Sequence, residues 1–575
     1  MTLGLTVWLL AAVPAPLTTQ GERSGYVETG RYDEVLSLCD AFPQRYPGRV
    51  KCEKFGTTPE GRPMVALIAS DDGALGDAAV RSKKRPVVYL QGGIHAGEID
   101  GKDAGFWLLR DLLDRKVGPG WLKAITVVFV PVLNVDGHER FGPHNRPNQV
   151  GPKEMGFRTT SQNFNLNRDW LKADAPETQA VLGLLNRYEP VLFLDLHVTD
   201  GAKFQHDISI MLEPQRVGPS TLMGLGRATS TEVLSEMTAK GHLPLDFYPS
   251  FDDYNDPASG FSRHMAPPRF ANAYWAYRNR FGVLVETHSW KDYRARVIAT
   301  YDACVALLGQ AVKVGAAWRS MIALNDAQQA DLRGADVVLV WRTDEKQSHP
   351  IEFQGYAYTR EESTVSGQKW TRYDESKPQV WNVPMHDVLQ PAVTVAAPRE
   401  GYYVPAPYAA LVSSKLKVHG IRFEVLKKAQ AIEAERFKAT QLERRPESFE
   451  GHATVKVQGE WAQGPLQLPP GSLFVPIAQA QSLLLMHLLE PAAPDSLVSW
   501  GFFNAHFESK EYMEDYIAEE VAREMLKDPA VKAQFDERLK KDAAFAKSPE
   551  KRLGFFYERH PSFDERLNLY PIGRR

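Results

Sequence analysis

The stretch that decides the fold is Val87-Val88-Tyr89-Leu90-Gln91-Gly92-Gly93-Ile94-His95-Ala96-Gly97-Glu98. Its first four residues form a short apolar run rich in β-branched side chains, which is typical of a buried strand, and the two glycines end that strand. Apolar residues then recur at helical spacing from Phe106 to Leu113. We therefore predict that His95 and Glu98 lie on the loop between the carboxyl end of a strand and a helix, where open α/β sheets bind ligands.

An imidazole and a carboxylate three residues apart can supply two ligands to zinc, although such a pair alone is more often an ordinary hydrogen-bonded pair. Catalytic zinc sites use three protein ligands and keep one position open. His197 ends a second buried run, Val191 to Leu196, and is the candidate for the third ligand. Asp195 lies on the same strand face as His197 and is either a partner that orients this ligand or a structural carboxylate.

A further acidic residue, Glu286, ends the apolar run Gly282-Val283-Leu284-Val285. Burying an unpaired carboxylate is costly, and a metal-bound water from which it takes a proton would explain its position. Asn167 and Arg168 lie in a stretch dense in hydrogen-bond donors. Arg168 can hold a carboxylate through two hydrogen bonds, or it is an ordinary surface arginine.

The chain of 575 residues is long enough for two or more domains. Four buried strands alternate with helices in the first 300 residues, which predicts an α/β fold with a mixed, mostly parallel sheet layered by helices. Short strand-like runs after about residue 331 predict a β-rich second domain. The predicted units are a signal peptide at 1–22, a catalytic domain at 25–325, a β-rich accessory domain at 331–500 and a helical C-terminal segment at 501–575.

Composition narrows the function classes. The net charge of −3 gives no reason to expect a nucleic-acid partner. The apolar run at residues 3–13 resembles the hydrophobic part of a signal peptide and predicts export, although the usual basic residues before it are missing. A buried strand or a membrane anchor are the alternatives, and no later stretch predicts a membrane span. Cys39 and Cys52 either pair after export or stay as free buried thiols.

The order His95-x-x-Glu98, Asn134-x-Asp136-Gly137, Asn167-Arg168, His197 and Glu286 resembles the zinc metallocarboxypeptidase family typified by carboxypeptidase A. The resemblance covers roughly residues 25–325 and implies hydrolysis of the last peptide bond of a peptide with a free C-terminus. It implies one Zn²⁺ ion per chain, bound by His95, Glu98 and His197. It also implies that Glu286 is the general base.

The same resemblance assigns the residues that handle the substrate. Asn167 and Arg168 match the pair that grips the terminal carboxylate of the peptide. The arginine that stabilises the oxyanion should precede this pair, and we assign it to Arg158, with Arg146 as the second choice. The family also uses a mobile tyrosine before the base, for which Tyr274 is the candidate. The segment that sets specificity in the family, here about residues 251–273, does not align with it.

Several assignments remain open at this point. Arg263 and Arg269 either favour acidic substrates or anchor loops, and His288 is either a second proton carrier or a structural histidine. The aspartoacylase and succinylglutamate desuccinylase group shares His-x-x-Glu, a later Asp-Leu-His and a base glutamate, and cleaves N-acyl amino acids. A binding protein that keeps the fold without the chemistry is the second alternative, and the presence of every ligand and the base disfavours it.

Overall fold

The computed structural model describes residues 17–575. Its N-terminal part is built on an eight-stranded mixed sheet with the order β1-β2-β4-β3-β5-β9-β6-β7. The four predicted buried strands are confirmed as β3, β4, β5 and β9, and they run parallel at the centre of the sheet. The strands are β1 (Val50–Thr57), β2 (Pro63–Ala69), β3 (Val87–Gly92), β4 (Thr126–Val130), β5 (Leu192–Thr199), β6 (Ile208–Glu213), β7 (Pro244–Leu245) and β9 (Phe281–His288).

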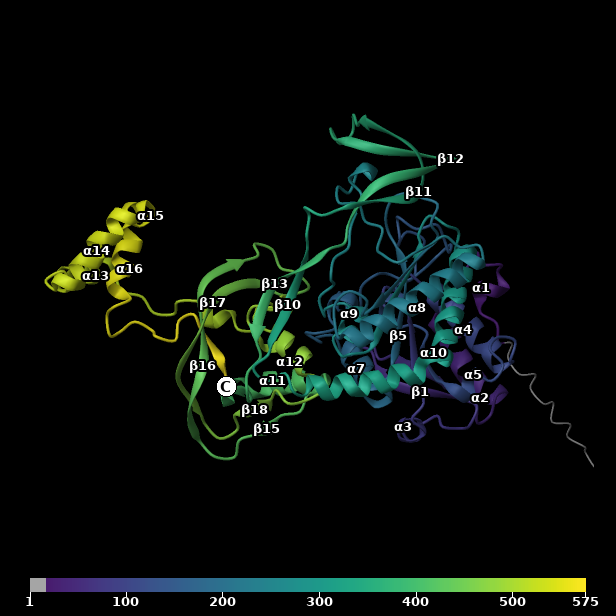
Figure 1. The fold of residues 1–575 in the computed structure, drawn as a ribbon, viewed down its shortest axis with the longest axis horizontal. Helices are drawn as coiled ribbons and strands as arrows, with labels where there is room; N and C mark the ends of the chain where they lie inside the picture. The colour runs from purple at the N-terminus through teal and green to yellow at the C-terminus, as the bar shows by residue number, and fades with distance from the viewer. Residues whose placement is uncertain (1–16) are drawn as a thin grey trace, which may run out of the picture.

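Helices cover both faces of this sheet (Figure 1). Leu196 on β5 faces α4, because a Cβ atom added at Gly101 would meet the Leu196 side chain. Phe193 points to the other face, where it packs on Trp275 of α9. The helices of this part are α1 (Gln20–Arg23), α2 (Tyr32–Arg45), α3 (Asp77–Lys83), α4 (Asp100–Leu113), α5 (Trp121–Ala124), α6 (Val135–Glu139), α7 (Pro176–Tyr188), α8 (Ser220–Ala239) and α9 (Ala271–Ala276), with 3-10 turns η1 (Leu166–Arg168) and η2 (Pro257–Ser259).

The long helix α10 (Tyr293–Gln329) closes the α/β part and packs against α4 and α8. Its N-cap, Asp292, accepts a hydrogen bond from the amide of Ala295 at 2.8 Å. The helix runs across the predicted domain boundary at residue 325. Ser482 donates a hydrogen bond to the carbonyl of Gln329 at 2.8 Å, so residues from the C-terminal part pack on the end of this helix. Within residues 17–575, α10 alone is long and apolar enough to cross a membrane, but 61% of its most apolar window is buried in the protein.

The chain after α10 is rich in strands, which confirms the predicted fold class (Figure 1). The strands are longer than the short runs in the sequence suggested. The longest ones form two hairpins, β11–β12 and β16–β17. A six-stranded sheet has the order β15-β18-β14-β19-β16-β17. The elements are β10 (Asp336–Thr343), β11 (His349–Glu362), β12 (Lys369–His386), β13 (Leu389–Ala396), β14 (Gly401–Val404), α11 (Ala406–Val418), β15 (Glu424–Val425), β16 (Gln430–Arg444), β17 (Val455–Leu468), β18 (Leu473–Pro476), α12 (Ser482–Leu489) and η3 (Asn504–Phe507).

The C-terminal segment is a small helical bundle that stands apart from the body (yellow in Figure 1). Its core consists mainly of the phenylalanines Phe535, Phe545, Phe555 and Phe556. The prediction of a helical end missed one strand, since β19 (Leu569–Arg574) returns to the six-stranded sheet and pairs with both β14 and β16. The helices are α13 (Asp515–Met525), α14 (Pro529–Lys541), α15 (Ala543–Lys547) and α16 (Pro549–Tyr557).

The C-terminal part is held to the α/β part by buried polar contacts. Arg269 lies beside Asp495, with 3.0 Å between Nε and Oδ1, and its amide donates to Oδ2 of the same carboxylate at 2.7 Å. Asp174 pairs with Lys415 at 2.6 Å and with His452 at 2.7 Å. One hydrophobic core cluster includes residues from both parts. Independent folding of the unit predicted at 25–325 would therefore expose a large interface, and that boundary stays a prediction.

Candidate metal centre and catalytic pocket

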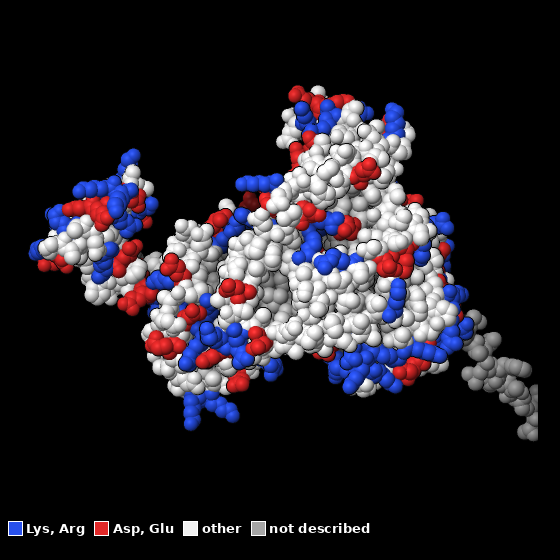
Figure 2. Space-filling model, in the orientation of Figure 1, with Lys and Arg blue, Asp and Glu red and all other residues white. Residues whose placement is uncertain are grey.

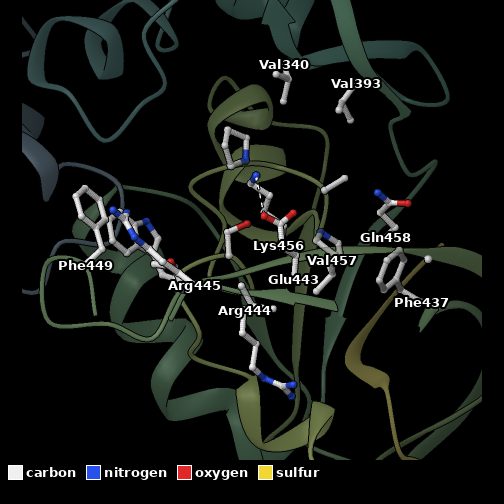
Figure 3. Close-up of a pocket in the computed structure, with 18 of the residues that line it drawn as sticks. Val340, Val393, Phe437, Glu443, Arg444, Arg445, Phe449, Lys456, Val457 and Gln458 are labelled. Atoms are coloured by element: carbon white, nitrogen blue, oxygen red, sulfur yellow. Dashed lines mark ion pairs between the residues drawn. The ribbon is translucent and has the colours of Figure 1, made fainter. Parts of the chain in front are cut away.

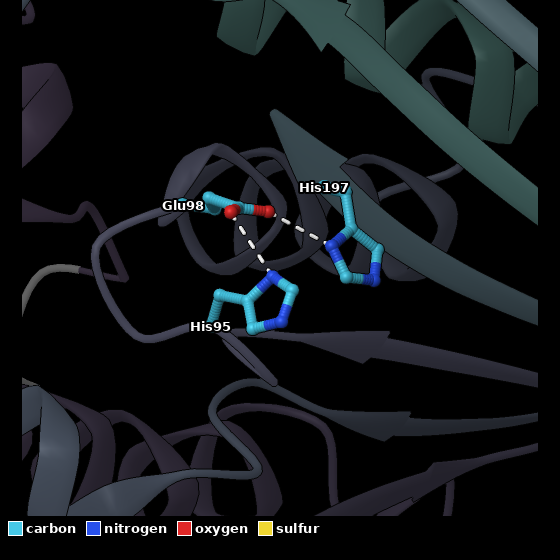
Figure 4. Close-up of side chains that lie close together, drawn as sticks. All are labelled: His95, Glu98 and His197. Carbon is cyan, nitrogen blue, oxygen red and sulfur yellow. Dashed lines mark hydrogen bonds and ion pairs between the residues drawn. The ribbon is translucent and has the colours of Figure 1, made fainter. Parts of the chain in front are cut away.

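Three buried side chains meet at the carboxyl edge of the central strands (Figure 4). His95 and Glu98 lie on the loop between β3 and α4, and His197 lies near the end of β5. The Nδ1 atoms of the two histidines lie 3.0 and 2.8 Å from the Glu98 carboxylate, and one ligand atom from each residue lies within 4.8 Å of the others. Two imidazoles and a carboxylate are a typical donor set for zinc, so the residues present fit this metal.

The loop reaches this position because glycines let it pass close to other backbone. A Cβ atom at Gly92 would lie 2.6 Å from the carbonyl oxygen of Pro131, and Gly93 has a φ of +60°. Positive φ strains most side chains but not glycine. The glycine pair that marks the strand end in the sequence is thus required by the turn that carries His95.

Each candidate imidazole ligand has a partner on its outer nitrogen. The Nε2 atom of His95 lies 3.0 Å from Oδ1 of Asn165. The Nε2 atom of His197 lies 2.9 Å from Oδ2 of Asp195, whose other oxygen accepts a hydrogen bond from Gln91 at 2.8 Å. Such partners fix the orientation of metal-binding histidines. This close approach favours the first of the two roles predicted for Asp195, although the two atoms do not form a hydrogen bond, whereas the contact of Asn165 with His95 was not predicted.

Glu286 lies next to this centre at the end of β9. The carboxylate is buried, and its Oε2 atom has no hydrogen-bond partner among residues 17–575. Burial raises the pKa of Glu286 to about 8, and the positive charge of His197 opposes that rise. An orphaned carboxylate oxygen beside three zinc-type donors is placed to accept a proton from a water molecule.

Two arginines border the centre on the side of Glu98. Arg146 and Arg158 each place an Nη1 atom near Oε1 of Glu98, at 3.0 and 3.3 Å. The side chain of Arg146 is 6% exposed and also pairs with Asp200, whereas that of Arg158 is 34% exposed and lines the pocket. Arg158 therefore has the access that a substrate-contacting group needs, in line with its choice over Arg146.

Asn167 and Arg168 line the same pocket as His95 and Glu286. Asn167 accepts a hydrogen bond from the amide of Ala271 at 3.0 Å, which fixes its side chain. The guanidinium of Arg168 stacks on Phe270 at 4.4 Å and donates to the carbonyl of Asn167 at 2.7 Å. No carboxylate within residues 17–575 forms an ion pair with it, and burial lowers its pKa. This half-buried cation is therefore free to receive an anion.

The prediction for Tyr274 is not met. Its ring is fully buried, packs on Trp170 and lies outside the pocket lining, and its hydroxyl lies 2.9 Å from Nδ1 of His419. Tyr248 lines the pocket instead, and its side chain is 40% exposed. Burial and the nearby Glu286 raise the pKa of the Tyr248 hydroxyl. No pattern in the sequence distinguishes Tyr248, because the loop that carries it has no regular periodicity.

The remaining open residues have structural surroundings. Arg263 pairs with Asp246 at 2.8 Å, and Arg269 pairs with Asp495, so neither offers an unpaired charge to an acidic substrate. His288 is buried and stacks on Phe204 with a ring separation of 3.9 Å. These contacts favour the loop-anchoring interpretation of both arginines and the structural one of His288.

The pocket lined by His95, Arg168 and Glu286, which we call the catalytic pocket, has a volume of about 550 Å³. A larger cavity of about 870 Å³ lies between the β10–β13 and β16–β17 pairs and shares no lining residue with it (Figure 3). The second cavity contains the ion pair Glu443–Lys456 at 3.5 Å. Of the candidate residues named from the sequence, this cavity is lined by Arg269, which pairs with Asp495, and by none of the candidate metal ligands or the candidate base.

Residues 35–208 match the family of zinc carboxypeptidases. The chain is 33% identical to mouse carboxypeptidase A4 over 164 residues, which are 27% of this chain and only 37% of that protein. It is 22% identical to carboxypeptidase 2 of Trichophyton rubrum over 73% of this chain and 74% of that protein. A metallo-carboxypeptidase from Burkholderia cenocepacia aligns with a TM-score of 0.35 and 17% identity, over 48% of this chain and 68% of that one.

The family match contains His95, Glu98, Asn167, Arg168 and His197 and ends before Glu286. It thus includes all three candidate metal ligands and the candidate carboxylate-binding pair, Asn167 and Arg168. Over residues 35–208, the chain is therefore similar to the family of zinc carboxypeptidases.

Proposed function

We propose that the protein is a zinc-dependent metallocarboxypeptidase that removes residues from the C-termini of peptides. The observation that carries this proposal is Arg168, which has no carboxylate partner among residues 17–575 and lines the same pocket as His95 and Glu286. A terminal carboxylate bound there would satisfy the guanidinium by a charge-assisted hydrogen bond. It would also bring the last peptide bond of the substrate toward Glu286.

The proposed mechanism assigns one role to each group. His95, Glu98 and His197 would hold zinc, which when bound supplies a Lewis acid and lowers the pKa of a water molecule. Glu286 takes a proton from the attacking water at Oε2 and gives it to the leaving amine. The unpaired Oε2 atom of Glu286 leaves that carboxylate oxygen available for both steps. Arg158 stabilises the negative charge on the carbonyl oxygen.

The decisive test compares one blocked peptide with a free C-terminus and the same peptide amidated. The free peptide should be cleaved with a far higher kcat/KM, and only its last residue should be released. Equal cleavage of the amidated peptide would refute the exopeptidase assignment. Cleavage of single N-acyl amino acids but not of peptides would favour the aspartoacylase and succinylglutamate desuccinylase type of reaction instead.

We also propose that the protein is exported. This rests on the apolar run at residues 3–13, which lies outside the described residues 17–575, and on the disulfide between Cys39 and Cys52. Disulfides persist mainly in oxidising compartments. Residues 19–22 pack on the domain, where Glu22 pairs with Arg110 at 2.5 Å, which argues for a leader that ends before the predicted residue 22. Thiols are titrated in denatured protein recovered from the culture medium or periplasm. One free thiol, that of Cys304, is expected. Two further titratable thiols would contradict the proposal.

A further inference from the structure

The β11–β12 hairpin belongs to the C-terminal part of the chain and contacts two loops of the α/β part beside the catalytic pocket. One loop contains Gln205, and the other contains residues 261–263. β12 pairs with β8 (Phe261–Ser262), and the amide of Arg263 donates to the carbonyl of His386 at 2.8 Å. The amide of Gln205 donates to the carbonyl of Gln354 at 2.8 Å. The hairpin rises above the α/β part in Figure 1, and Figure 2 shows charges of both signs at its far end with mostly uncharged surface below.

A separate aromatic core fixes the base of this hairpin. Phe353 and Trp381 come from the hairpin, and they pack with Phe247, Phe251 and Phe261 from the loop that borders the pocket. The ring centroids of Phe261 and Phe353 lie 4.7 Å apart, and those of Phe251 and Trp381 lie 6.0 Å apart. Aromatic packing of this kind holds both surfaces in one arrangement. The hairpin therefore belongs to the wall of the site and is not a loose appendage.

Between the hairpin and the α/β part lies a cavity of about 340 Å³, which we call the aromatic groove. Two of its rings face solvent, with Tyr254 74% and Trp370 44% exposed. Clustered exposed aromatic rings often mark a binding surface. The groove is lined by Asp200, Gly201, Ala202, Tyr248, Pro249, Ser250, Phe251, Tyr254, Asn255, Trp370, Thr371 and Tyr373.

The groove adjoins the catalytic pocket. Tyr248, Ser250 and Phe251 line both. The residues of the carboxylate grip, Asn167 and Arg168, line only the catalytic pocket. A peptide whose terminal carboxylate binds Arg168 and whose last bond lies beside Glu286 must leave the pocket by another side, and the groove, which shares three lining residues with the pocket, is the adjoining space that can receive it.

We propose that the aromatic groove binds the residues of a polypeptide substrate on the amino side of the cleaved bond. This inference rests on the proposed function, because it takes the position of the C-terminus from Arg168. The substrate class is then an extended peptide rather than a blocked dipeptide. Asp200 is the only charged side chain in the groove lining and already pairs with Arg146 at 3.3 Å, so the groove suits uncharged residues with apolar or aromatic side chains.

The test uses two blocked substrates that share their last two residues and differ in length on the amino side. One is an N-acyl dipeptide, and the other is an N-acyl pentapeptide with apolar upstream residues. Wild type should cleave the pentapeptide with a higher kcat/KM. Trp370→Ala should lower kcat/KM for the pentapeptide by about tenfold, the scale of one lost aromatic contact, and should change that for the dipeptide less than twofold.

The matched controls are Trp370→Phe, which keeps a ring, and Val365→Ser, which alters the same hairpin at a residue that is 96% exposed and outside the groove. Trp370→Phe should keep most of the preference for length, and Val365→Ser should leave both substrates unaffected. An equal loss on both substrates in Trp370→Ala, or no loss on either, would overturn the proposal.

A binding measurement separates this inference from the proposed function. The N-acyl tetrapeptide left after cleavage should bind wild type about tenfold more tightly than Trp370→Ala, whether or not either protein is active. If wild type cleaves no peptide but shows this difference, the proposed function fails, and the groove is a peptide-binding site without a role in cleavage. If wild type cleaves peptides but the two proteins bind the tetrapeptide equally well, the groove proposal fails and the proposed function is unaffected. Trp370-dependent binding of an N-acetylglucosamine tetrasaccharide, without binding of the peptide, would overturn the proposal in favour of a glycan site.

Discussion

Glu286 lies directly opposite His197 in the register of the parallel strands β5 and β9. Two residues from distant parts of the sequence, one a candidate ligand and the other the candidate base, are thus placed side by side by the ladder of the sheet. Hydrogen bonds of adjacent parallel strands fix such pairs rigidly. The distance between metal and base would therefore depend on the sheet rather than on a loop.

Changing the candidate base tests the proposed mechanism. Glu286→Gln keeps the shape of the side chain but cannot accept the proton of a water molecule. The rate of peptide cleavage should fall by roughly 10² to 10⁴, while the zinc content stays unchanged. Single-turnover rates and metal analysis of the same preparation give both values. Retention of near wild-type rates would remove Glu286 from the proton transfer.

Metal content tests the three ligands. Purified protein should contain about one zinc ion per chain, as expected of a site with three protein ligands. His197→Ala should lose the metal, and Asp195→Asn should weaken zinc binding by about 10 to 100-fold because it removes the partner of the ligand. The control is His264→Ala, which changes a histidine of the same pocket outside the cluster. Full zinc occupancy in His197→Ala would contradict the site.

Replacing the carboxylate grip tests the direction in which substrates bind. Arg168→Ala should lower kcat/KM for a peptide with a free C-terminus by roughly 10 to 10²-fold, the value of a hydrogen bond to a charged group. It should have little effect on the slow cleavage of the amidated peptide. Arg216→Ala is the matched control, since this pocket arginine already pairs with Glu213 at 3.3 Å. A similar loss on both peptides would show that Arg168 supports the fold instead.

The stability of the α/β part should depend on pH through His242. This imidazole lies 2.6 Å from Asp207 and 3.2 Å from Asp302, and hydrogen bonds to these carboxylates raise its pKa from 6.5 to about 9. Because the folded pKa is the higher one, the stabilisation is complete below about pH 6.5 and is lost as the pH rises through about 9.

The measurement is the free energy of unfolding of wild type and His242→Asn between pH 6 and 10. Because the group is partly solvated, the difference should be about 1 kcal/mol at pH 6 and should vanish at pH 10. His349→Asn, at a histidine that is 54% exposed, is the control and should show little difference at any pH. If the difference in the free energy of unfolding between wild type and His242→Asn stays constant with pH, the contacts of His242 do not depend on the charge of its imidazole.

Residues at strand ends could be predicted from the sequence, and residues on irregular loops could not. His95, His197 and Glu286 each follow a buried apolar run, and parallel strands bring such ends to one edge of the sheet. Tyr248 lies on a loop with no repeating pattern, so nothing local distinguishes it from Tyr274. The contact between Asn165 and His95 joins residues 70 positions apart and depends on how that loop folds.

The second half of the chain was predicted less well for a similar reason. Its short apolar runs indicated strands, but the long arms of β11 and β12 have mixed polar sequences and gain their order from each other and from the core around Phe353 and Trp381. Strand β19 was missed because it is six residues long and follows a helical stretch. Its place between β14 and β16 depends on partners more than 130 residues away.

That place of β19 has a consequence for biosynthesis. The strand is hydrogen-bonded to β14 on one side and to β16 on the other, so it joins two halves of one sheet. All other strands of the sheet leave the ribosome before it, and they must wait with open edges while the helical bundle is translated. The sheet can close only after residue 574 has emerged, so this sheet is completed last. Exposed strand edges are prone to pair wrongly, so this delay is a stage at which β14 and β16 can mispair.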